Sequence, residues 1–249
     1  MTGTVDLVLD RTWAYGPGIT HGGFLLQTLA AAAVTEAHPD PVAVSAHFLS
    51  APRLGAAQVV VEALRTGRST STTRTQLVQG GRTCLDAVVT SGRLPETSEP
   101  TYMDGAPPVL PPFQDCRRNG PAPGHERNGI TEQLDIRLDP AASAWLGERS
   151  NRAEVRGWLR ATDGSDASAL SLVCLADALP PVTFSLGLRG WVPTVQLTVH
   201  VRARPAPGWI RAVQRAVLVQ GGWLDEQCEL WDARGALVAQ ASQLAMYRA

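Results

Sequence analysis

The residue of this sequence best suited to acid–base chemistry is Asp177, a carboxylate near the end of an apolar run. It lies in the stretch ALSLVCLADAL, whose other residues carry no charge. Apolar surroundings penalise the ionised form of a carboxylate and raise its pKa, which suits a general base working near neutral pH. A solvent-exposed aspartate at a helix end is the alternative interpretation of the same residue.

A second unusual stretch is THGG, where His21, Gly22 and Gly23 stand directly before the long apolar segment FLLQTLAAAA. Glycine costs a helix roughly 1 kcal/mol relative to alanine, so two together need a reason. The free N–H groups at a helix start attract negative charge, and glycine lets other atoms approach the backbone closely. The stretch predicts either a binding surface at the helix start, or a turn in which Thr20 caps the helix and the glycines permit tight packing.

Each of these two regions belongs to a predicted helix. We expect the helices at about residues 21–37 and 166–178. Asp166 and Ser168 are candidate N-caps of the second helix, because their side chains accept hydrogen bonds from free backbone N–H groups. The Pro180–Pro181 pair ends this helix.

A series of strand-like segments follows each predicted helix. The first strand of each series carries a histidine and has a proline five residues beyond it, His47 with Pro52 and His200 with Pro205. Equivalent histidines favour a packing contact between two similar halves, and two functional sites are the alternative. Further β-rich segments follow, some alternating apolar and polar residues as in QCELWD, with glycines where hairpin turns are expected. These glycines are Gly67, Gly80, Gly81, Gly221, Gly222 and Gly235.

A segment of linker composition separates the two series. Residues 93–128 are rich in Pro, Gly, Ser and Thr, which predicts an N-terminal unit at 1–92 and a C-terminal unit at 129–249. Each unit is expected to hold its helix against the concave side of an antiparallel sheet of about five strands, an α+β architecture. The two sheets would pair edge to edge or face to face, and edge pairing removes exposed strand edges.

Composition and charge exclude several classes of protein. The chain has 249 residues, 44% of them hydrophobic, enough for one large or two small domains with cores. A net charge of −1 argues against nucleic acid or an anionic membrane as partner. There is no signal peptide pattern and no apolar run of about 18–20 residues, the length of a membrane span. The four cysteines are scattered. We therefore expect a cytoplasmic protein without a metal or other cofactor.

Five stretches of the chain carry a family resemblance when taken in order: HGGFLLQTLAAAA, VSAHFLSAPRLG, LADALPP, PTVQLTVHVRARPAPGW and GALVAQASQLAMYR. In this order and spacing they resemble the type II acyl-CoA thioesterases. The resemblance implies a tandem "double hotdog" fold, in which a long helix of each unit is wrapped by its sheet. It also implies hydrolysis of an acyl-CoA thioester to free acid and CoA, and a homodimer or higher homo-oligomer.

The same resemblance implies three catalytic residues on the second unit, at Asp177, Thr194 and Gln243. A threonine in a strand is ordinary by itself, whereas a buried glutamine needs partners for its donors and acceptor. The implied mechanism has Asp177 take a proton from a water held by Thr194 and Gln243. That water attacks the thioester carbonyl, whose oxyanion needs preorganised donors. A solvent-facing Gln243 is the alternative.

Substrate-binding residues follow from the resemblance as well. His21, Gly22 and Gly23 would line the acyl or thioester region. Apart from the resemblance, Arg68 is a candidate to meet the phosphates of CoA, because arginine suits bidentate phosphate contacts; a solvated strand end is the favoured alternative.

Other functions stay open at this point. The thioester carrier is either CoA or an acyl carrier protein, and acting on the latter would give a specialised biosynthetic role. A protein that binds acyl thioesters without hydrolysing them is a further alternative, because fold does not fix function. Hydration of enoyl-CoA is disfavoured, since HPDPVAV does not match the Asp-x-Asn-Pro-x-His signature of hotdog hydratases.

Overall fold

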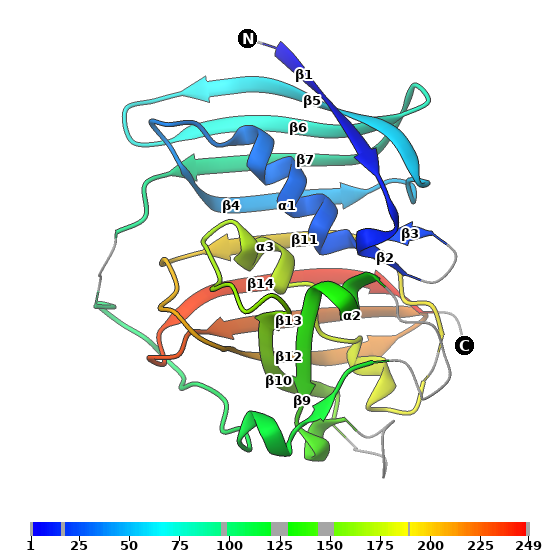
Figure 1. Cartoon of the computed structure of the whole chain (residues 1–249), viewed down its shortest axis with the longest axis vertical. Coiled ribbons are helices and arrows are strands. Elements are labelled where there is room, and N and C mark those ends of the chain that lie inside the picture. The colour runs from blue at the N-terminus through cyan, green and yellow to red at the C-terminus, as the bar shows by residue number, and fades with distance from the viewer. Residues whose placement is uncertain are drawn as a thin grey trace.

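The computed structural model describes residues 2–15, 18–95, 99–120, 129–143, 152–188 and 190–247. Within these ranges one antiparallel sheet of twelve strands dominates the molecule, in the order β1-β5-β6-β7-β4-β11-β14-β13-β12-β10-β9-β8 (Figure 1). Its strands are β1 (Thr2–Leu9), β4 (Asp40–Phe48), β5 (Gly55–Thr66), β6 (Ser71–Gln79), β7 (Arg82–Gly92), β8 (Arg117–Arg118), β9 (Leu134–Leu138), β10 (Glu154–Ala161), β11 (Thr194–Val201), β12 (Ile210–Gln220), β13 (Trp223–Trp231) and β14 (Leu237–Met246).

Two helices on one side of this sheet position the residues of interest. The helix α1 (Gly22–Ala33) packs against β4, β5, β6 and β7, and the short helix α3 (Ser171–Leu175) packs against α1 and β11 (Figure 1). The buried side chains of α1 include Leu25, Leu26 and Leu29, which form part of the core. The other short elements are β2 (Ala14–Tyr15), β3 (Ile19–Thr20), α2 (Gly129–Gln133) and the 3-10 helices η1 (Arg11–Trp13), η2 (Phe113–Asp115), η3 (Pro140–Ala142) and η5 (Val182–Phe184).

The strands of the first and second parts of the chain meet edge to edge at β4 and β11. These two strands pair antiparallel, and Ser45 Oγ lies 2.8 Å from Thr198 Oγ1 across the junction. His47 and His200 lie on the same two strands, opposite Gln196 and Ala43 respectively. Both histidines are exposed and alternate with buried residues, so they point away from the helices. Both histidines therefore lie on the exposed face of the two junction strands, and their role stays a prediction.

The predicted second helix is wrong in its length, because α3 has only five residues. Ser168 Oγ accepts from the Ser171 N–H at 3.1 Å, so this serine caps the first turn and the helix does not extend further back. Asp166 does not cap it, because its carboxylate accepts from the Gly208 N–H at 2.9 Å. After Leu175 the backbone tightens into 3-10 bonds, of which one joins the Asp177 N–H to the Cys174 carbonyl oxygen at 3.1 Å.

The first helix was predicted to reach residue 37 but ends at Ala33. Val34 is extended, with ψ 151°. Beyond it, a local turn uses the backbone and side chain of Thr35 to bond His38, whose N–H donates to Thr35 Oγ1 at 3.2 Å. Pro39 also disfavours a helical conformation for the residue before it.

The end of the proline-rich segment packs on the second group of strands. The Trp158 Nε1–H of β10 donates to the Pro111 carbonyl oxygen at 2.8 Å, Cys116 is buried, and β8 pairs with β9. The domain bounds given above stay a prediction.

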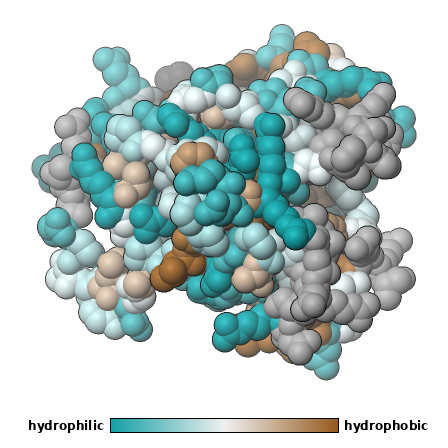
Figure 2. Space-filling view, turned by 60° about the horizontal axis from the view of Figure 1, so that its bottom comes forward, coloured by the Kyte–Doolittle hydropathy of each residue, from teal (hydrophilic) through white to brown (hydrophobic). Residues whose placement is uncertain are grey.

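In the described part of the chain, no helix is both long and apolar enough to cross a membrane. Figure 2 shows hydrophilic residues over much of one face, with apolar residues in small separate groups.

Candidate functional site

The start of α1 and the end of α3 meet at a junction that only glycine permits. A Cβ added to Gly23 would lie 2.6 Å from the Cys174 carbonyl oxygen and 2.9 Å from Asp177 Cβ. A Cβ added to Gly22 would lie 2.9 Å from Asp177 Oδ2 and 3.2 Å from the Phe48 ring. Both distances to Asp177 are shorter than ordinary van der Waals contact. The two glycines of THGG therefore let Asp177 approach the backbone at the start of α1.

Asp177 is the carboxylate at this junction, and its side chain is only 12% exposed. Burial raises the pKa of Asp177 to about 7, and a hydrogen bond from the Gly23 backbone N–H opposes this shift. The start of α1 carries a partial positive charge, which also favours the ionised carboxylate. Asp177 can therefore be ionised near neutral pH and still accept a proton there.

His21 joins the two helices through both ring nitrogens. Its Nδ1 accepts from the Phe24 N–H at 3.2 Å, which makes His21, rather than Thr20, the side-chain cap of α1. Since Nδ1 accepts, Nε2 carries the proton and donates to the Asp177 carbonyl oxygen at 3.0 Å. Burial lowers the pKa of His21 to about 4, although the bond to Asp177 raises it slightly. The ring is therefore neutral at pH 7, and its Nε2 lies 3.7 Å from Asp177 Oδ2.

Thr194 and Gln243 form a second polar pair. Gln243 Nε2 donates to Thr194 Oγ1 at 2.9 Å. Thr194 opens β11 at an irregularity in its pairing with β14. On β14, Gln243 alternates in phase with the buried residues Ala241 and Ala245, so its side chain points to the helix side of the sheet. This orientation does not agree with the alternative of a solvent-facing glutamine.

Glu226 is a buried carboxylate that the sequence analysis missed. It lies directly opposite Gln243 in the pairing of β13 with β14, and it is 2% exposed. Its Oε1 accepts from the Val182 N–H at 2.8 Å. Burial raises the pKa of Glu226 to about 7, the Val182 bond and the nearby Gln214 amide lower it, and the charge of Asp177 raises it. Gln243 therefore lies opposite a buried carboxylate on the sheet, and the charge of Asp177 acts on that carboxylate.

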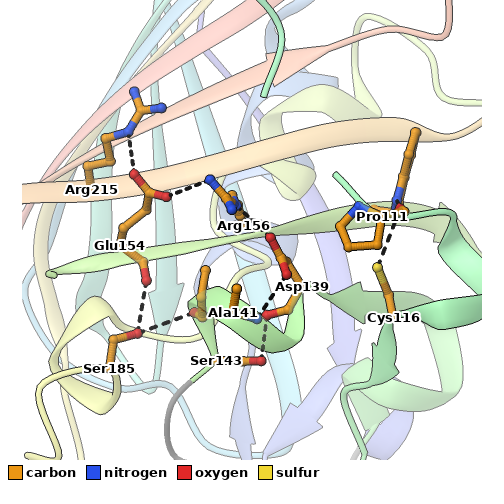
Figure 3. A network of polar contacts seen from close by, with 11 residues as sticks. Pro111, Cys116, Asp139, Ala141, Ser143, Glu154, Arg156, Ser185 and Arg215 are labelled. Carbon is orange, nitrogen blue, oxygen red and sulfur yellow. Dashed lines mark hydrogen bonds and ion pairs between the residues drawn. The ribbon is translucent and has the colours of Figure 1, made fainter. Parts of the chain in front are cut away.

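A polar network around Glu154 connects the turn that carries Val182 to the neighbouring strands (Figure 3). Just after η5, Ser185 Oγ donates to the Glu154 carbonyl oxygen at 2.9 Å. The Glu154 carboxylate in turn accepts from Arg215 Nε at 3.0 Å and from Arg156 Nη1 at 3.2 Å. Arg156 also donates to Asp139 Oδ2 at 2.7 Å. The network anchors η5 to β10 and β12 and so holds the Val182 N–H in place.

Arg68 does not belong to this group of residues. It is exposed in the turn between β5 and β6, and its carbonyl oxygen lies 3.3 Å from His38 Nε2. His38 follows the C-terminal end of α1, whereas Asp177 lies at the N-terminal end. A role for Arg68 in phosphate binding stays a prediction.

Among the described residues, no group of three or more His, Cys, Asp or Glu side chains is arranged to hold a metal ion.

Comparisons with known proteins identify related chains. Family models described as the acyl-CoA thioesterase N-terminal and C-terminal domains match residues 9–92 and 111–247. Uncharacterised proteins of Mycobacterium tuberculosis and Mycobacterium bovis are 34% identical, over 96% of this chain and 89% of theirs. A crystal structure from Thermobifida fusca, provisionally described as a thioesterase II, is 33% identical with a TM-score of 0.90, over 99% of this chain and 92% of that one.

A further solved structure concerns the fold alone. A conserved protein from Alicyclobacillus acidocaldarius, described as having a hot dog fold, is 22% identical with a TM-score of 0.85, over 99% of this chain and 93% of that one. The large antiparallel sheet with helices on one side is accordingly a hotdog fold.

Proposed function

Because the chain belongs to the acyl-CoA thioesterase family, we propose that it hydrolyses acyl-CoA thioesters with Asp177 as the general base. The observation that carries this proposal is a nearly buried carboxylate, with a pKa of about 7, held against the glycine-opened start of α1. A base whose pKa lies near the working pH combines a useful ionised fraction with sufficient proton affinity.

In the proposed reaction, the ionised Asp177 takes a proton from a water molecule while the water oxygen forms a bond to the thioester carbonyl carbon. The carbonyl becomes a tetrahedral oxyanion, and its collapse breaks the carbon–sulfur bond and releases the CoA thiolate. A thiolate is a stable leaving group, so no strong general acid is needed. The neutral His21 serves as a positioning residue, because its Nε2–H holds the backbone of Asp177.

Thr194 and Gln243 are proposed to orient the attacking water. Gln243 uses one amide hydrogen on Thr194, which leaves its second amide hydrogen, its carbonyl oxygen and the Thr194 hydroxyl hydrogen for the water. The support for this role is that the Gln243 side chain points to the helix side of the sheet, the side on which Asp177 also lies. The positive end of the α1 dipole lies beside the reaction and favours the developing oxyanion.

We interpret the two groups of strands as two tandem hotdog units joined at β4 and β11, of which only the first retains a long helix. The proposed site then takes His21, Gly22 and Gly23 from the first unit and its other residues from the second. A cytoplasmic location and a homo-oligomer stay predictions.

The test is thiol release from a panel of acyl-CoAs by the wild type and by Asp177→Asn, which keeps the shape of the side chain. We expect kcat/KM of the variant to fall by about 10² or more. An Asp225→Asn variant changes an exposed carboxylate on β13 and controls for surface charge. An Asp177→Asn enzyme within a few-fold of the wild type would overturn the assignment of the base. Acyl-CoA binding without any thiol release would instead favour the non-catalytic alternative or an acyl-carrier-protein substrate.

A further inference from the structure

The two ends of the twelve-stranded sheet differ in how their edge strands are protected. The edge strand β8 consists of Arg117 and Arg118 only, and the chain goes on to cover β9, because the Asn119 N–H donates to the Ile136 carbonyl oxygen at 2.8 Å. The other edge strand, β1, has eight residues and pairs only with β5 in the described part of the chain (Figure 1). Short edge strands and charged side chains prevent further pairing, whereas a long edge strand without such protection is open to another strand.

The sequence of β1, TGTVDLVL, has none of the usual protection. It contains no lysine, arginine or proline, and its one charge is Asp6. Val5 is 53% exposed and Val8 is 71% exposed. Val5 lies on the helix side of the sheet, because it pairs with the buried Val59, and Val8 lies on the opposite face. Apolar side chains are thus exposed on both faces of a strand that has room for a neighbour.

We propose that a second copy of the chain pairs with this edge, β1 against β1, so that the two twelve-stranded sheets become one. An antiparallel pair about a two-fold axis sets one residue opposite its own copy. With Val5 at that point, the strands pair from Thr2 to Val8 in each copy. Opposed residues of an antiparallel pair point to the same face, so the helices of both copies lie on one side of the joined sheet.

Charge and length favour Val5 as the centre of the pairing. Thr4 then lies opposite the partner's Asp6, where its hydroxyl can donate to the carboxylate, and the symmetry repeats this contact. A centre at Asp6 would set two carboxylates directly opposite each other, which is destabilising. A centre at Thr4 would leave the exposed Val8 outside the pairing. The strand therefore complements itself, and this favours a second copy over an unrelated strand as the partner.

The experiment measures the dissociation constant of the dimer by analytical ultracentrifugation of the full chain. We expect a dimeric wild type, and a Kd raised by roughly tenfold or more in Val5→Lys, because this variant sets like charges directly opposite each other. The matched control is Val8→Lys, which puts the same charge on an exposed residue opposite the partner's Thr2 and should leave the dimer intact. An equimolar mixture of Val5→Lys and Val5→Glu should regain the dimer, which misfolded variants would not do.

Cysteine variants locate the two-fold axis. The Cα atoms of opposed residues are about 4.5–5.5 Å apart, within the range of a disulfide, so oxidised Val5→Cys should form a cross-linked dimer on non-reducing electrophoresis. In Val8→Cys the two thiols would lie roughly 20 Å apart along the strands and should not cross-link. The four native cysteines are free and buried, which keeps the background low.

Three results would each overturn this proposal: a wild type that is monomeric at micromolar concentrations, a dimer that Val5→Lys leaves intact, and equal cross-linking of the two cysteine variants. A wild-type monomer would leave β1 open to a strand of another protein instead. The proposed function is tested separately by thiol release, and Val5→Lys should keep the kcat/KM of the wild type, because Val5 does not belong to the proposed site.

Discussion

Replacing Gly23 by alanine tests whether the close contact between α1 and α3 is needed for stability and activity. The new Cβ would lie 2.6 Å from the Cys174 carbonyl oxygen, and it needs roughly 0.8 Å more to reach the 3.4 Å of ordinary van der Waals contact. The atom it meets belongs to the backbone of α3, so a side-chain rotation cannot relieve the clash. Overpacking of this kind costs about 1–3 kcal/mol. For a chain of this length, each kcal/mol lowers Tm by roughly 2–4 °C.

The displacement acts on activity as well as stability. Since α1 carries His21 and the N–H that bonds Asp177, a shift approaching 1 Å between the helices should lower kcat/KM by up to about 10². Calorimetry and thiol release measure the two effects on one preparation. The control is Gly3→Ala, because a Cβ on Gly3 in β1 meets nothing within 4 Å. A Gly23→Ala protein as stable and as active as the Gly3→Ala protein would refute the close helix contact.

Three further outcomes follow from the charges and caps of the site. Since burial raises the pKa of Asp177 to about 7 and the base works ionised, kcat/KM should fall about tenfold per pH unit below that value and level off above it; a flat profile would contradict this. The same pKa lies above the ordinary value of 3.8, so burying the ionised Asp177 destabilises the folded protein. This loss of stability is almost absent at about pH 4, where the carboxyl group is largely protonated in the folded protein, and it is complete at about pH 8. Asp177→Asn should therefore raise Tm relative to wild type at about pH 8 but not at about pH 4. An equal change in Tm at the two pH values would contradict a stability cost that depends on ionisation of Asp177. His21→Ala should cost about 1 kcal/mol or more by loss of the α1 cap, whereas the exposed His47→Ala should change stability by less than about 0.5 kcal/mol in urea unfolding.

The strands could be predicted from the sequence because their signals are local. Alternating polarity and glycine turns mark the hairpins, and the residues Gly80, Gly81, Gly221 and Gly222 do adopt positive φ at the tips. The length of the second helix was overestimated, because an apolar run does not reveal how the ends of a helix are hydrogen-bonded. Ser168 caps the helix from inside the predicted range, and the 3-10 bonds after Leu175 end it early.

The site could be predicted only in part, for a physical reason. His21 and Asp177 are 156 residues apart, and no spacing rule joins them; only the packing of α1 on α3 does so. Glu226 carried a local signal, since it alternates in phase with the buried residues Leu224, Cys228 and Leu230. A charged residue at an inner-face position of a strand is a candidate for function, whereas the usual assumption that charge means exposure hides it.

The position of Asp177 follows from how the two parts of the chain share one site. An aspartate at the end of its own helix would oppose that helix's dipole, but α3 has only five residues and a correspondingly small dipole. The twelve-residue α1 instead presents its positive end to the carboxylate. The second part of the chain supplies the carboxylate and the first supplies the field that keeps it ionisable despite burial. Without the first part of the chain, Asp177 would lose both the Gly23 N–H and the positive end of α1.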